Sequence, residues 1–91
     1  MEQLPSIWYD QIRIRPDSAY SVFHGQRTAY VVFKNKSSVV LRLEWLDANQ
    51  QWESEELHPN CNMVVETTCA QAVNETAEEQ LGWYRVVCVP V

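Results

Sequence analysis

The stretch that most limits how this chain can fold runs from Ala29 to Asp47. It begins with a nearly continuous apolar run, continues through residues 34–38, which favour a turn, and ends in an alternation of apolar and polar residues. Such alternation is typical of a half-buried β-strand. We therefore predict two antiparallel strands that form a hairpin with one buried face. The side expected to face the core consists of Val39, Leu41, Leu43 and Trp45.

Further short strands are predicted around residues 11–15, 62–67 and 83–89. Residues 19–24 are expected to form a short strand or a packed loop, and a strand or extended segment is expected to contain Trp52. Gly25 to Arg27 is expected to reverse the chain ahead of the central hairpin. Residues 68–81 have apolar side chains three and four positions apart, which predicts one short helix. A long loop is the alternative, because Asn74, Glu75 and Thr76 are poor helix formers.

The fold prediction is a small antiparallel β-sandwich, or partly open barrel, of six to seven short strands. We expect a single domain over residues 1–91, in which we find no internal repeat. Hydrophobic residues make up 46% of the chain and include four tryptophans, so it can fold without a disulfide or a metal. No apolar run is long enough to cross a membrane.

The cysteines and the N-terminal residues indicate a cytoplasmic location. There are three cysteines, an odd number that favours reduced thiols. The first residues lack the basic and apolar regions of a secretory signal. Two sequences match the N-glycosylation pattern, Asn35-Lys36-Ser37 and Asn74-Glu75-Thr76, and we give them little weight because such matches are common by chance.

The net charge of -5 is concentrated in the second half of the chain, which after Asp47 has seven glutamates and one arginine. Binding of a nucleic-acid backbone is disfavoured, because it needs clustered cations. A basic protein surface is the electrostatically favoured partner. The alternative is that the glutamates only keep a small domain soluble. The predicted acidic surface consists of Glu53, Glu55, Glu56, Glu75, Glu78 and Glu79.

No residue pattern typical of catalysis is found, and we expect neither enzymatic activity nor a cofactor. Paired glutamates lie in charge runs, and no glycine-rich phosphate-binding motif is present. His58, Cys61 and Met63 are soft ligands close in sequence and could hold copper(I) or zinc. We favour the alternative, in which they are ordinary turn and core residues.

Aromatic residues exceed what one core of this size usually takes up, and spare tryptophan or tyrosine side chains often anchor a partner. Trp52 lies between a polar turn and three glutamates, and Tyr84 alternates with Trp83. We therefore expect Trp52 and Tyr84 to be exposed. The alternative is that they cover the open ends of the core.

The central residues resemble the β-domain of the von Hippel-Lindau tumour suppressor family. The resemblance covers roughly residues 20–88. It is carried by Val32-Phe33, Asn35, Ser37, Trp45-Leu46-Asp47, Leu57-x-Pro59, Thr67-Thr68 and the final Gly82 to Val86.

This resemblance implies a small β-sandwich that recognises a protein partner, in the best-known member a hydroxyproline-bearing peptide. Trp45 matches the tryptophan at the floor of the family's pocket, and Thr67 lies where a pocket serine is expected. Ser54 occupies the position of the pocket tyrosine. Gln71 and Val73 lie where a histidine and a tryptophan are expected, so the resemblance implies protein binding and leaves the ligand open.

The first functional hypothesis is a non-enzymatic module that docks a protein or peptide through a sheet edge and aromatic loops. Its candidate contact residues are Trp45, Trp52, Ser54, Thr67 and Tyr84. A second hypothesis is a small acidic inhibitor or anti-defence protein that blocks a basic, nucleic-acid-handling enzyme. A third is a soft-metal protein that uses Cys61, Met63 and His58. Free strand edges allow a monomer or a weak homodimer.

Overall fold

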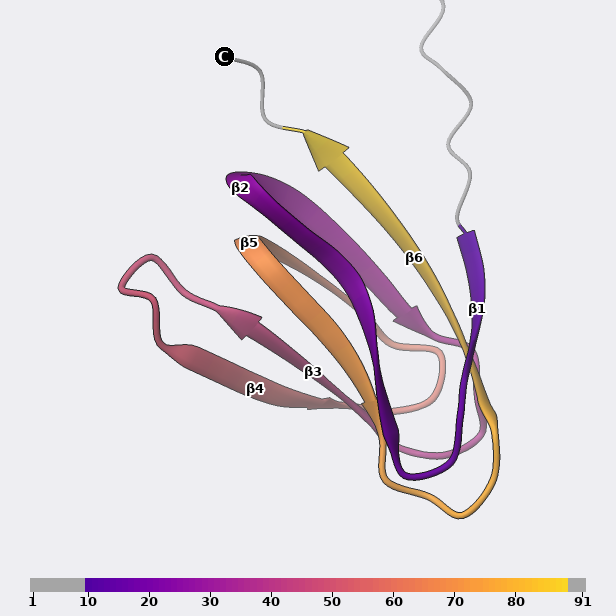
Figure 1. The fold of residues 1–91 in the computed structure, drawn as a ribbon. Helices are drawn as coiled ribbons and strands as arrows, with labels where there is room; N and C mark the ends of the chain where they lie inside the picture. Colours follow the sequence, from indigo (N-terminus) through magenta and orange to yellow (C-terminus); the bar gives the residue numbers. More distant parts are fainter. Residues whose placement is uncertain (1–9, 89–91) are drawn as a thin grey trace, which may run out of the picture.

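The computed structural model describes residues 10–88, and they form one open six-stranded antiparallel sheet (Figure 1). In sheet order the strands run β1-β6-β2-β5-β3-β4, so β1 and β4 lie at the two edges. The all-β class and the antiparallel pairing are confirmed. The strands are β1 (Asp10–Ile14), β2 (Ser18–Asn35), β3 (Leu41–Leu46), β4 (Trp52–Leu57), β5 (Asn62–Asn74) and β6 (Gln80–Cys88).

The helix predicted near residues 68–81 is wrong. Residues 68–74 continue strand β5, and the chain then turns into β6 at Gln80. The inward positions Ala70, Ala72 and Asn74 are buried at a spacing of two, which is the strand period. The described residues contain no helix, so none that could span a membrane.

The predicted central hairpin is also wrong, although both of its strands exist. β2 and β3 are not neighbours, because β5 lies between them and pairs with both. Residues 36–40 therefore connect the end of β2, which lies beside the start of β5 at Asn62, to the start of β3, which lies beside the end of β5 at Val73. The strand at residues 19–24 is part of the same β2, and Gly25–Thr28 form a bulge opposite Thr68 instead of a reversal.

The core lies on one face of the sheet, and the predicted inward side of β3 is confirmed. Leu41 and Leu43 are buried, and Val39 and Trp45 pack against the core. Gly82 is required by this packing, because a Cβ there would lie 2.6 Å from the end of the Phe33 ring. The buried apolar residues are Ile12, Ile14, Val22, Ala29, Val31, Phe33, Leu41, Leu43, Leu57, Val65, Ala70 and Ala72.

The sheet is internally symmetric, which the sequence analysis missed. Exchanging β1, β2 and β3 with β4, β5 and β6 leaves the strand order unchanged, since β1 pairs with β6 as β4 pairs with β3. The register agrees as well: Ile14 lies opposite Gln80, and Leu57 lies opposite Leu41. The inner pairs β2-β6 and β5-β3 differ by two residues in register. Figure 1 shows the paired β2 and β5 between the two outer sets of strands.

Both halves begin with the same turn. Ile14-Arg15-Pro16-Asp17 in the first half corresponds to Leu57-His58-Pro59-Asn60 in the second, 43 positions later. Asp17 and Asn60 have positive φ angles of 52° and 66°, a conformation that Asp and Asn tolerate better than most residues. A proline, Pro16 or Pro59, directly precedes each of these residues, and the proline ring fixes the φ angle at that position of the turn.

Both halves also use one buried asparagine to close the connection to their last strand. Nδ2 of Asn35 donates to the carbonyls of Val39 (2.7 Å) and Leu57 (2.8 Å), and its Oδ1 accepts from the Ser37 amide and hydroxyl. Asn74 is 39 positions later, and its Nδ2 donates to the carbonyls of Glu78 (2.7 Å) and Ile14 (3.0 Å). Its Oδ1 accepts two bonds from Thr76. Both asparagines are 0% exposed, so neither is placed to accept a glycan.

Candidate functional site

The edge strand β4 is the most exposed strand of the sheet. Every residue from Trp52 to Glu56 is exposed, and only Leu57 is buried. The Trp52 side chain is 53% exposed, which confirms its predicted exposure. Since β3 pairs with only one side of β4, the backbone of the other side is unpaired within the described residues. β4 therefore offers a free strand edge with an exposed aromatic side chain at its start.

A shallow hollow of about 560 Å³ lies beside Trp52, on the sheet face opposite the core. Its lining comes from three neighbouring strands, because Ser54 of β4 lies opposite Glu44 of β3, and Glu44 lies opposite Gln71 of β5. Cross-strand partners have side chains on the same face of a sheet. The lining residues are Glu44, Trp52, Glu53, Ser54 and Gln71.

A chain of polar contacts fixes the carboxylate at the floor of this hollow. Gln71 Nε2 donates to Glu44 Oε1 at 2.6 Å, and Arg42 Nε donates to Glu44 Oε2 at 3.2 Å. Arg42 Nη1 also reaches Glu75 Oε1 at 2.9 Å. Glu44 is mostly buried, with its side chain 25% exposed. Because Arg42 is shared between two carboxylates, the network keeps an excess of negative charge.

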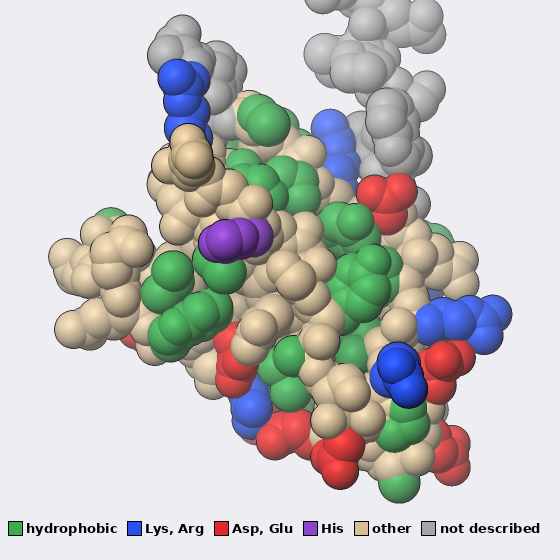
Figure 2. Space-filling view, viewed as in Figure 1, with side chains coloured by type: hydrophobic (Ala, Val, Ile, Leu, Met, Phe, Trp, Pro, Cys, Tyr) green, Lys and Arg blue, Asp and Glu red, His purple; other side chains and the backbone are tan. Residues whose placement is uncertain are grey.

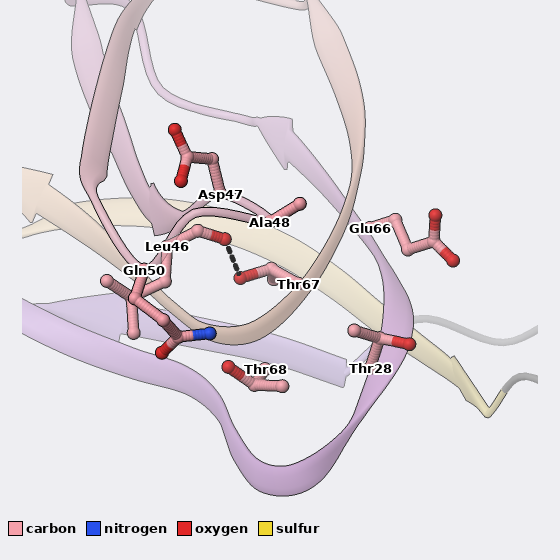
Figure 3. Close-up of a pocket in the computed structure, with 8 residues that line it drawn as sticks. All are labelled: Thr28, Leu46, Asp47, Ala48, Gln50, Glu66, Thr67 and Thr68. Atoms are coloured by element: carbon pink, nitrogen blue, oxygen red, sulfur yellow. Dashed lines mark hydrogen bonds between the residues drawn. The ribbon is translucent and has the colours of Figure 1, made fainter.

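A second hollow, of about 270 Å³, lies where β5 is irregular and the turn after β3 crosses it (Figure 3). The Thr67 hydroxyl, predicted as a contact residue, points at this turn and donates to the Leu46 carbonyl at 2.6 Å. It also accepts from the Cys69 amide at 3.1 Å, and Thr67 is 1% exposed. This hydroxyl holds the turn in place and is not free to meet a partner.

The turn beside this second hollow is organised by Asp47. Its Oδ1 accepts from the backbone amides of Asn49 (2.8 Å) and Gln51 (3.0 Å), and Gln50 has a positive φ of 63°. Such side-chain bonds to nearby amides are what aspartate contributes to turns. Thr67 and Asp47, two of the residues that line the second hollow, are thus engaged in bonds that shape the turn.

Tyr84 is half-buried, so its predicted exposure is wrong. It packs against the core, and its ring lies 6.4 Å from that of Tyr20. Burial raises the pKa of the Tyr84 hydroxyl. The charge of Asp10, the charge interaction with Tyr20 and a hydrogen bond with Asp10 raise this pKa further. In the sheet, β2, β5 and β3 separate Tyr84 on β6 from Trp52 on β4. The two aromatics therefore do not form one surface.

Of the five predicted contact residues, the structure brings Trp52 and Ser54 together in the hollow of β4. Trp45 lies behind them, on the core face opposite Glu53, and is half-buried. Glu44 and Gln71 complete the hollow and were missed as site residues. The only sequence signal for Glu44 was its outward position in the alternation of β3.

The predicted acidic surface divides into two groups. Glu53, Glu55 and Glu56 lie on β4, and among the described residues none of them is in an ion pair. Glu75, Glu78 and Glu79 lie in the connection before β6, where Glu75 pairs with Arg42 and Glu79 pairs with Arg13. Figure 2 shows red acidic side chains gathered along the lower part of the molecule, below a centre of hydrophobic ones.

The three residues of the metal hypothesis lie in the turn before β5 and at the start of that strand. His58 and the exposed Cys61 share the turn before β5, and Met63 packs against the core. Across residues 10–88, no three His, Cys, Asp or Glu side chains are placed to hold one ion. All three cysteines lie in this range and are free thiols.

Comparison with known proteins finds no matching family model, no matching curated protein and no matching solved structure. The support for a function therefore comes from the geometry of β4 and its hollow.

Proposed function

We propose that this chain is a non-enzymatic protein-binding module that docks an extended segment of a partner along the free edge of β4. The observation that carries the proposal is an exposed tryptophan, Trp52, at a free strand edge beside a hollow. A free edge pairs with an added strand through backbone hydrogen bonds, and side-chain pockets then provide selectivity. Tryptophan is among the residues that most often dominate binding energy at interfaces.

The charge of this edge favours a basic partner. Glu53, Glu55 and Glu56 leave β4 without a compensating ion pair in the described part of the chain. Unpaired surface charge raises the association rate with oppositely charged partners and excludes acidic ones. The same three glutamates support the second candidate function, an acidic inhibitor or anti-defence protein that blocks a basic, nucleic-acid-handling enzyme. In that case binding would weaken steeply with salt and would stop the activity of the captured enzyme.

The proposal extends to the resemblance with the von Hippel-Lindau β-domain and to a two-layered β-sandwich. In support, β6 pairs with only residues 29–35 of β2, and β3 pairs with only residues 70–73 of β5. One end of the paired strands β2 and β5 is therefore extended by β6 and β1, and the other end by β3 and β4. A strand that bends at bulges can belong to two packed layers.

The test is affinity capture with the full chain and two matched variants. Trp52→Ala should lose the captured partner, because it removes the aromatic anchor at the edge. Tyr30→Ala removes an aromatic side chain that is 43% exposed on β2, and it should leave capture unchanged. Circular dichroism of both variants checks that the sheet is intact. Equal capture by the wild type and Trp52→Ala would exclude β4 as the docking edge.

A further inference from the structure

We propose that the hollow beside Trp52 is a subsite for one arginine side chain of the docked segment. This inference rests on the proposed docking edge and specifies what that edge selects. Besides the edge itself, it depends on the exposed indole, on the charges that line the hollow and on the polar network that fixes its floor.

The indole provides the first half of the subsite. Trp52 is the second-most exposed of the large hydrophobic side chains in the described residues, after Val64. It lies on the sheet face opposite the core, on which Leu46 is its cross-strand partner. A guanidinium group is planar and stacks on an indole face, where the cation–π interaction stabilises it. An ammonium group lacks this planar contact.

The charges around the hollow provide the second half. Glu44 lines it, and Glu75 is joined to Glu44 through Arg42. Glu56 lies opposite Arg42 on the same face, so three carboxylates against one guanidinium leave this face net negative around the hollow. An incoming cation is therefore attracted to it, whereas a carboxylate would be repelled.

The floor of the hollow is preorganised for a charged donor. Glu44 accepts one bond at each of its two oxygens, from Gln71 and from Arg42. An ionised carboxylate offers about four acceptor positions, so lone pairs remain for an additional donor. Because the orientation of Glu44 is already fixed by these bonds, little side-chain entropy is lost when the donor arrives. Arginine, with five donors in a rigid fork, suits such a site better than lysine.

The hollow is also placed correctly for a segment docked on β4. Trp52 and Ser54 are two residues apart on the edge strand, so both point to the face on which the hollow lies. A residue of the added strand on this same face would lie next to them. A long side chain from that residue can extend across β4 toward Glu44, while a short one cannot.

The experiment uses the full chain and blocked seven-residue peptides of alternating threonine and valine. Each peptide carries arginine at one position, and for each a partner peptide carries citrulline, the neutral isostere, at that position. A third series carries lysine. Affinities are measured by NMR titration, with the indole N–H signal of Trp52 identified by its loss in Trp52→Phe.

We expect the best arginine peptide to bind at least about tenfold more tightly than its citrulline counterpart and to shift the Trp52 indole signal. Lysine should fall between the two. In Trp52→Ala, arginine and citrulline peptides should bind with similar affinity, because the stacking partner is gone, whereas Tyr30→Ala should keep the full difference. Such a double comparison isolates the contact between the two groups.

The outcomes separate this inference from the function on which it rests. Equal binding of arginine and citrulline peptides to the wild type would overturn the arginine subsite and leave docking on β4 supported. Absence of binding by every peptide at millimolar concentration would overturn the docking function itself. An arginine preference that persists unchanged in Trp52→Ala would place the cation site elsewhere on the acidic surface and would also overturn the inference.

Discussion

The two halves of the sheet close with the same asparagine turns and differ most at their edge strands. In β1, Ile12 and Ile14 both point into the core and are buried. In β4, Leu57 takes the place of Ile14, but the exposed Glu55 takes the place of Ile12. An apolar residue therefore fits this position of the fold, but only the first half of the chain has one, Ile12. We therefore expect the carboxylate of Glu55 to contribute little to stability, which agrees with the proposed docking edge at β4.

A second difference lies one residue pair further along the same edges. Tyr84 of β6 faces Asp10 of β1, and at the equivalent place Trp45 of β3 faces Glu53 of β4. Both aromatic rings pack against the core. A hydrogen bond with Asp10 helps to raise the pKa of the Tyr84 hydroxyl. Glu53 is exposed and is in no ion pair within residues 10–88.

The largest loss of stability is expected from removing the buried asparagine that each half contains. Asn35→Ala removes a side chain that donates to two carbonyls, and Asn74→Ala removes one that donates to three; each side chain also accepts two hydrogen bonds. Each substitution leaves buried groups unsatisfied, so each should lower the free energy of unfolding by roughly 3–5 kcal/mol in urea denaturation. Similar losses are the expected result. A large loss of unfolding free energy for one asparagine and a loss below about 1 kcal/mol for the other would show that the two asparagines do not stabilise their halves equally.

The sequence allowed the strands to be predicted better than their neighbours. The alternation in Leu41, Leu43 and Trp45 is local, and it correctly identified the inward side of β3. The function of Asn35 depends on the carbonyl of Leu57, 22 positions away, and that of Asn74 on the carbonyl of Ile14, 60 positions away. Local patterns contain no information on such partners, so a connection between two strands that do not pair was interpreted as a hairpin.

The internal symmetry was missed because a few short motifs carry it. The spacing between equivalent residues falls from 43 at the first turn to 39 at the asparagine, because β2 has four residues that β5 lacks, one at Val22 and three in the bulge Gly25–Thr28. No single offset therefore aligns the halves. Of the site, Trp52 could be predicted from its polar neighbours, whereas Glu44 and Gln71 meet Trp52 only through the pairing of β3 with β5.

Exchanging Ile12 of β1 and Glu55 of β4, each for the residue type of the other, should change the free energy of unfolding less, and in opposite directions. Ile12→Glu places a carboxylate in the core and should cost about 3 kcal/mol of unfolding free energy. Glu55→Ile gives β4 the residue type of β1 and should stabilise the sheet by about 0.5–1 kcal/mol while it weakens partner capture. Thermal denaturation and capture measure the two effects. If Glu55→Ile lost stability, the position would not be equivalent to Ile12, and the assignment of the carboxylate to binding would lose its basis.

The smallest effect should appear at alkaline pH and only in the half that contains the tyrosine. The pKa of Tyr84 is raised by burial and by Asp10, so the folded protein keeps this proton at a pH where the unfolded chain has released it. The stability contributed by the neutral hydroxyl is therefore present below pH 10 and is lost as the pH rises through the folded pKa. Tyr84→Phe should flatten this part of the curve of unfolding free energy against pH, and Asp10→Asn should move the tyrosinate absorbance transition of Tyr84 to lower pH. An unchanged alkaline slope in Tyr84→Phe would mean that the hydroxyl is as well solvated as in the unfolded chain, and Tyr84 would then be open to a partner just as Trp52 is.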